Sequence, residues 1–155
     1  MKKLLLITLI ILVITSLACI TTQQTPELIQ AINQVRLNTL NQANRLNDFA
    51  QYRFSKLNYP YLSHTNFRKD YSNFMGNRGY LEKGTIVNCG EIIQVAYDYK
   101  AKFYNIDTDD LIRSWLNSSS HREVILNEKW QNIGCYIGYK DQYTIIIVVE
   151  FDTLY

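Results

Sequence analysis

Apolar residues recur along the chain with two different periods, which separate predicted helices from predicted strands. From Pro26 to residue 40, and again from Leu46 to Leu57, they recur at about every third or fourth position. This spacing predicts two amphipathic helices. Proline suits the first turn of a helix, and Pro60 ends the second one because the residue before a proline avoids the helical region.

The helical period fades between His64 and Glu91, in a stretch rich in Asn, Tyr and Arg. Three glycines interrupt this stretch: Gly76, Gly79 and Gly84. We interpret residues 65–88 as a long loop with one helical turn at most. A loop of about 20 residues inside a compact domain is unusual and often functional, so this one could shape the rim of a pocket.

Strand and helix-capping patterns follow the loop. Residues 89–95 carry β-branched side chains next to a glycine, which predicts a strand. Residues 107–110, D-T-D-D, supply capping side chains and negative charge for the N-terminus of a helix whose apolar stripe ends at Trp115. Ser120 followed by Glu123 matches the capping box of a short next helix.

The clearest strand pattern lies at the C-terminus, where residues 133–139 and 143–151 flank the short turn 140–142 and predict a hairpin. Apolar residues of the second strand occupy both of its faces: Tyr143, Ile145, Ile147, Val149 and Phe151 on one, Ile146 and Val148 on the other. Such a strand needs cover on both sides. The order of elements therefore predicts a small antiparallel sheet between helical layers.

The N-terminal residues have the pattern of an export signal. Lys2 and Lys3 precede an apolar run, residues 4–17, which is shorter than the roughly 20 apolar residues that a membrane-spanning helix needs. The run ends in small residues directly before Cys19. This resembles the lipobox of bacterial lipoproteins, although Ser16 lies where that pattern usually has Leu.

The lipobox resemblance implies acyl chains, such as palmitate, on Cys19. One chain holds a protein only marginally, whereas several make the anchoring stable. We therefore divide the chain into a signal peptide (1–18), a polar tether (19–26) and one domain (27–155), a length typical of single domains.

Charge argues against a nucleic-acid partner. The chain has 16 Lys+Arg and 14 Asp+Glu, and removing Lys2 and Lys3 with the signal peptide leaves 14 against 14. A nucleic-acid-binding protein needs a basic footprint, which a neutral domain without a long basic run does not provide.

Two cysteines remain once Cys19 is assigned to the lipid. Cys89 and Cys135 form an even pair in an exported protein, where a disulfide is permitted. Closing that loop would contribute roughly 4 kcal/mol in the chain-entropy description. The alternative is two separate buried thiols, because free cysteine packs as a small hydrophobe.

Six short motifs occur in a consistent order between Glu27 and Phe151. They are E-L-I-Q-A-I-N-Q-V-R from Glu27, L-N-D-F-A-Q-Y-R from Leu46, Ser63-His64, G-E-I-I from Gly90, W-L-N-S-S-S-H-R-E-V-I-L from Trp115 and I-G-C-Y-I-G from Ile133. Together they resemble the CAP superfamily of cysteine-rich secretory, antigen 5 and pathogenesis-related proteins, in its bacterial secreted branch. The resemblance implies an α/β/α sandwich with a central cleft.

In the fuller family pattern, two histidines and two glutamates line that cleft. His64, Glu91 and His121 match three of them, and Ser118 lies where the second glutamate would be. Ile92 also replaces the usual Asn. Because a hydroxyl is not a carboxylate, these departures count against strict metal or acid–base chemistry, and the resemblance implies a ligand-binding cleft of His64, Glu91, Ser118 and His121.

Three functional classes follow. Two imidazoles and a carboxylate could bind Zn²⁺ weakly, with His64 and His121 as ligands, or they could form a hydrogen-bonded cluster that holds the layers together. We expect no resident cofactor and favour a non-enzymatic lipoprotein, anchored to the cell or outer membrane and exposed at the surface, which binds a host protein or a lipid such as a sterol. The alternatives are a metal-dependent hydrolase using His64, Glu91 and His121, and a structural envelope protein with a vestigial cleft.

Overall fold

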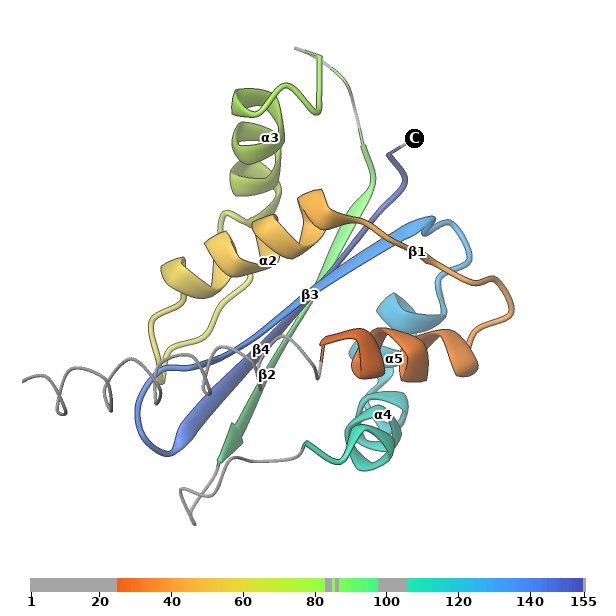
Figure 1. Ribbon diagram of the computed structural model, residues 1–155, viewed down its shortest axis with the longest axis vertical. Coiled ribbons are helices and arrows are strands. Elements are labelled where there is room, and N and C mark those ends of the chain that lie inside the picture. Colours follow the sequence, from red (N-terminus) through yellow and green to blue (C-terminus); the bar gives the residue numbers. More distant parts are fainter. Residues whose placement is uncertain (1–24, 83–84, 86, 98–105, 155) are drawn as a thin grey trace, which may run out of the picture.

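The computed structural model describes residues 25–82, 85, 87–97 and 106–154. Within them, a four-stranded sheet lies between two groups of helices, so the predicted α/β/α sandwich is confirmed (Figure 1). The helices are residues 25–34, α2 (Asn44–Lys56), α3 (Phe67–Asn77), α4 (Thr108–Asn117) and α5 (Ser119–Leu126). The strands are β1 (Asn41–Gln42), β2 (Cys89–Tyr97), β3 (Asn132–Tyr139) and β4 (Thr144–Asp152).

The predicted N-terminal segments lie mostly beyond this description. The signal peptide 1–18, with the tether up to residue 24, is outside the described residues, and the first helix already includes Thr25 and Pro26. None of the helices in the described residues is both long and apolar enough to span a membrane.

The sheet has the strand order β1-β3-β4-β2. The predicted hairpin is present, and both β3 and β2 pair with β4 in antiparallel fashion. The sequence pattern did not predict β1, which adds two residues parallel to β3 through the pairs Asn41–Asn132 and Gln42–Ile133 and makes the sheet mixed. Those two residues are polar and exposed, so they carry no strand periodicity.

Strand β4 is buried along its whole length, as its two apolar faces require. Ile147 and Phe151 belong to the core shared with the first helix, α4 and α5. Ile146 and Val148 point the other way and pack in a separate cluster with Ala50 and Leu57 of the α2 side. Figure 1 shows α2 and α3 on one side of the sheet and the remaining helices on the other.

Residues 67–77 form helix α3, so the prediction of a loop there is wrong. Phe67, Tyr71, Phe74 and Met75 are buried at helical spacing and pack against Phe49 of α2. The Phe49 ring meets Tyr71 edge-on at a centroid distance of 5.2 Å. The glycines misled the prediction because Gly76 lies in the last turn of the helix and Gly79, with φ 74°, follows its end.

One capping prediction is confirmed and the other is wrong. Asp107 caps α4 by accepting hydrogen bonds from the backbone N–H groups of Asp109 and Asp110 at 3.1 and 3.0 Å. Ser120 is not the N-cap residue of α5. Ser118 occupies that position, and the Ser118 side chain makes no capping hydrogen bond. Helix α4 ends at Asn117 and α5 begins at Ser119, so Ser120 already lies inside α5.

Of the two alternatives that the sequence left open for Cys89 and Cys135, the structure has separate thiols and no disulfide. Cys89 lies on β2 and Cys135 on β3, with β4 between them. Neighbouring strands are about 4.8 Å apart, so these Cα atoms are separated by at least about 10 Å, beyond the roughly 7 Å that a disulfide can bridge. Their partners on β4, Asp152 and Val149, face opposite sides of the sheet.

Candidate functional site

A buried ion pair between Glu91 and Arg53 forms the base of the site. Glu91 lies on β2, and Arg53 reaches it from α2 with two bonds: Nε to Oε2 at 2.7 Å and Nη2 to Oε1 at 3.0 Å. Both side chains are almost wholly buried. Burial alone would raise the pKa of Glu91, but the hydrogen bonds from His64 and Arg53 outweigh burial and hold that pKa below its ordinary value.

His64 is the exposed part of this network. Its Nδ1 lies 3.0 Å from Oε1 of Glu91, and 58% of its side chain is exposed. A carboxylate accepts hydrogen bonds, so Nδ1 carries the proton that is donated to Glu91, and Nε2 lies on the other side of the ring. The sequence-predicted residues His64 and Glu91 are therefore brought into direct contact.

Two further groups fix Arg53 and the backbone beside His64. Asp70 of α3 accepts a bond from Nη1 of Arg53 at 2.7 Å, and the carbonyl of Ser63 accepts one from Nη2 at 3.4 Å. The sequence interpretation missed Asp70 because its segment was taken for a loop. A helical reading of the Phe67–Tyr71–Phe74 spacing would have placed Asp70 beside the buried stripe.

His121 and Ser118 lie at the junction of α4 and α5, without a hydrogen bond to His64 or Glu91. The centroids of the His121 and Trp115 rings are 6.5 Å apart, and Oγ of Ser118 is 3.3 Å from Oγ of Ser120. Burial lowers the pKa of His121, and the positive charge of His64 lowers it further. In the part of the chain that the structure describes, no three His, Cys, Asp or Glu side chains are grouped so as to hold a metal ion.

A polar hollow of about 380 Å³ adjoins Arg53 and the residues on both sides of His64. Every lining residue except Leu57 has a polar side chain. The lining is Tyr52, Arg53, Lys56, Leu57, Asn58, Tyr61, Ser63, Thr65, Asn66 and Asp70. Such a lining offers both donors and acceptors and gives little apolar surface to a hydrocarbon chain.

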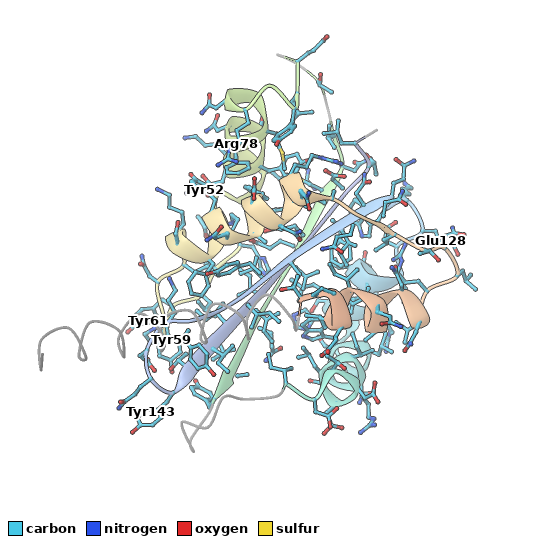
Figure 2. All side chains as sticks on the ribbon, viewed as in Figure 1. Tyr52, Tyr59, Tyr61, Arg78, Glu128 and Tyr143 are labelled. Carbon is cyan, nitrogen blue, oxygen red and sulfur yellow. The ribbon has the colours of Figure 1, made fainter. Side chains whose placement is uncertain are left out.

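Tyrosines are exposed at one end of the molecule. Figure 2 shows Tyr59, Tyr61 and Tyr143 at the end where the β3–β4 hairpin turns. Tyr61 is 85% exposed, and the Tyr59 hydroxyl lies 2.9 Å from that of Tyr97. Tyrosine rings of this kind suit an amphipathic binding surface.

Glu150 of β4 is a buried acid that the sequence interpretation did not single out. It is the register partner of Glu91, and neither of its carboxylate oxygens has a hydrogen-bond partner in the described part of the chain. The available pattern was its position in V-V-E-F-D, where alternation places it on the same face as Ile146 and Val148.

Comparison with known proteins rests on structure, because no family profile and no curated protein sequence matches the chain. An outer surface protein from Borrelia burgdorferi has a TM-score of 0.62 at 24% identity, over 84% of this chain and 92% of that one. A cysteine-rich secretory protein from Staphylococcus aureus has a TM-score of 0.60 at 19% identity, over 86% of this chain and 39% of that one. This chain has the CAP fold.

A third neighbour, an extracellular Bacillus anthracis protein containing an SCP domain, has a TM-score of 0.54 at 21% identity, over 84% of this chain and 40% of that one. The chain thus spans about two fifths of the length of the two larger proteins. The resemblance recognised from the six sequence motifs is confirmed at the level of the fold.

Proposed function

We propose that this protein is exported, anchored through acyl chains on Cys19, and displays a CAP domain that binds a partner without catalysing a reaction. The signal-like residues 1–18 and the small residue before Cys19 support export and lipidation. The structural neighbours include an outer surface protein and an extracellular protein, which supports the same location.

The observation that carries the binding function is the fixed, exposed imidazole of His64. Glu91 orients the ring, Arg53 fixes Glu91, and the two neighbours of His64, Ser63 and Thr65, line the polar hollow. A site held in one conformation before binding loses less entropy when its partner arrives. Ser118 supplies a hydroxyl where a second carboxylate would be needed, so binding is favoured over acid–base catalysis.

The hollow favours a polar partner, such as the surface of a host protein, over a lipid. Lys56, Asn58 and Asp70 line it with a cation, an amide and a carboxylate, and the Tyr61 side chain is free to pack against a partner. Fatty acids and sterols would need a mostly apolar cavity of this size.

Surface plasmon resonance against a panel of extracellular-matrix and serum proteins, with palmitate and cholesterol as further probes, tests the binding function. For any protein that binds, we expect His64→Asn and Tyr61→Ser to weaken affinity at least about tenfold, the effect of losing one good contact. Tyr80→Ser, which removes an exposed tyrosine outside the hollow, is the matched control. Binding of palmitate or cholesterol that both site variants weaken would refute a polar partner at this site.

Lipid anchoring has its own test. Cells expressing the protein should incorporate labelled palmitate into it and retain it in the membrane fraction, and Cys19→Ser should abolish both results. Release of the wild-type protein into the medium without label would contradict the anchor.

A divalent cation is the second candidate ligand, because imidazole and carboxylate side chains such as those of His64, His121 and Glu91 are ligands of Zn²⁺. If the site is a binding surface without metal, calorimetric titration with micromolar Zn²⁺ gives no heat and chelation leaves the melting temperature unchanged. Zn²⁺ binding that His64→Asn and His121→Asn each abolish would instead support the metal-dependent hydrolase.

A further inference from the structure

Glu150 lies in the centre of the molecule, closed off from water. Its exposed fraction is 0%, and its neighbours across the sheet are Glu91 on β2 and Gly134 on β3. Directly opposed side chains on adjacent strands have Cβ atoms about 4.5–5.5 Å apart. Helix α2 covers this point so closely that a Cβ on Gly134 would lie 2.3 Å from Leu46.

The arginines that α2 brings to this face already have other acids as partners. Arg45 binds Asp152 at 2.9 Å, and Arg53 binds both Glu91 and Asp70. Asp152 is also bonded by the Tyr71 hydroxyl at 2.7 Å and by the Asn132 amide at 2.8 Å. Among the described residues, only Glu150 of the three buried strand carboxyls lacks a hydrogen-bond partner.

An ionised Glu150 would be expensive in this position. A buried charge without a partner costs several kcal/mol, and two adjacent carboxylates cannot both ionise easily. Among the described residues, the charged or titratable groups with the main influence on it, or influenced by it, are Glu91, Asp152, Cys89, Cys135 and the cation Arg53. Burial raises the pKa of Glu150 well above its ordinary value, and the charge of Glu91 raises it further.

We propose that Glu150 remains protonated at neutral pH, and that Glu91 and Glu150 together hold one proton beneath His64. The site then presents one carboxylate charge, which Arg53 neutralises, instead of two. Glu150 is a positioning residue, because it acts on His64 only through Glu91. This assignment rests on the buried geometry and does not depend on which partner binds at the surface.

Proton uptake at Glu150 on folding makes the stability of the protein depend on pH. In the unfolded chain a glutamate has a pKa of about 4.3, so folding at neutral pH takes up a proton at Glu150. Because the folded pKa is the higher one, this contribution is complete below about pH 4 and is lost as the pH rises toward the folded pKa.

Urea unfolding of the wild type and of Glu150→Gln between pH 5 and pH 8 tests this, because glutamine mimics the neutral acid. We expect the unfolding constant of the wild type, relative to that of Glu150→Gln, to rise about tenfold per pH unit until the folded Glu150 ionises. Glu123→Gln, which changes an exposed glutamate of α5, should give a constant ratio. A constant ratio for Glu150→Gln as well would overturn the proposal.

A measurement on the wild type alone covers the case in which Glu150→Gln folds poorly or is ambiguous. Infrared spectroscopy of the folded wild type at pH 7 should show the C=O stretch of a neutral carboxylic acid, which unfolding removes. If Glu150 were ionised, the acid band would be missing.

Discussion

Arg53 joins more parts of this molecule than any other side chain in the site. Its guanidinium extends from α2 and bonds Glu91 on β2, Asp70 on α3 and the carbonyl of Ser63. The planar fork of arginine can serve several acceptors at once, which a lysine cannot do. Because Glu91 in turn holds His64, the orientation of the exposed imidazole depends on a buried residue of another element.

Arg53→Ala should therefore destabilise the fold strongly. It leaves the buried Glu91 carboxylate without its main partner, which typically costs about 3–5 kcal/mol. The free energy of unfolding from urea denaturation measures the loss. Arg113→Ala removes an ion pair with Asp110 whose side chains are 70% and 66% exposed, and it should change stability by less than about 0.5 kcal/mol. Equal, small losses for the two variants would contradict the role of Arg53.

The two histidines should influence each other's titration. Burial is the first cause of the lowered pKa of His121 and the positive charge of His64 the second, so His64→Asn should raise that pKa without restoring its ordinary value. NMR titration of the His121 ring protons measures the change. Arg78→Gln, which removes a positive charge from the end of α3, should have no effect.

The lowered pKa of His121 also makes the stability of the protein depend on pH. Because the folded pKa of His121 lies below the unfolded one, its contribution to stability is present above about pH 6.5 and is lost as the pH falls. A pKa of His121 that stays unchanged in His64→Asn would mean that the two imidazoles are too distant to share a ligand.

Among the elements, α2 is decisive because it approaches β3 without intervening side chains. A Cβ on Gly134 would lie 2.3 Å from the Leu46 backbone and 2.4 Å from the Asn47 nitrogen. Asn47 also accepts the Cys135 N–H through its side chain at 2.9 Å. This close approach sets the position of Arg53 and excludes water from Glu150.

Gly134→Ala should force α2 away from the sheet. Overpacking a core costs about 1–3 kcal/mol, and the upper end applies here because the clash is with backbone that cannot rotate away. Gly76→Ala is the matched control: Gly76 is in α3, nothing lies within 4 Å of its added Cβ, and alanine should stabilise the helix by up to about 1 kcal/mol. Thermal unfolding of both variants distinguishes the outcomes, and a neutral Gly134→Ala would show that α2 can shift at no cost.

At the scale of the whole molecule, the three layers bring distant residues together and keep the two cysteines apart. Arg53 and Glu91 are 38 residues apart in sequence and in contact in the fold. Cys89 and Cys135 are both adjacent to β4 but lie on opposite sides of it. The same sheet therefore creates the ion pair and prevents the disulfide.

Thiol chemistry should reflect that separation. In a Cys19→Ser protein, both remaining cysteines should react with iodoacetamide after unfolding without reductant, and reductant should not change the melting temperature. The folded protein should react slowly, because burial raises the pKa of Cys89 to about 12 and leaves little thiolate. A molecular mass two hydrogen atoms below that of the dithiol protein, with no iodoacetamide label taken up, would show a disulfide.

The sequence by itself determined most of the elements and the two apolar faces of β4. These follow from local periodicity, since burying an apolar face requires no particular partner. His64 and Glu91 were indicated by the resemblance of short motifs to the CAP superfamily, and not by periodicity. The sequence pattern did not predict α3, because the glycines near the end of that helix indicated a loop although its aromatic residues have helical spacing.

Only the tertiary structure decided which polar groups pair. It assigned Arg53 to Glu91 and Arg45 to Asp152, and it left Glu150 buried without a hydrogen-bond partner among the described residues. Hydrogen bonds and ion pairs act over a few ångströms and in fixed directions, so they depend on how elements far apart in sequence are placed. A pattern along the chain does not contain that placement.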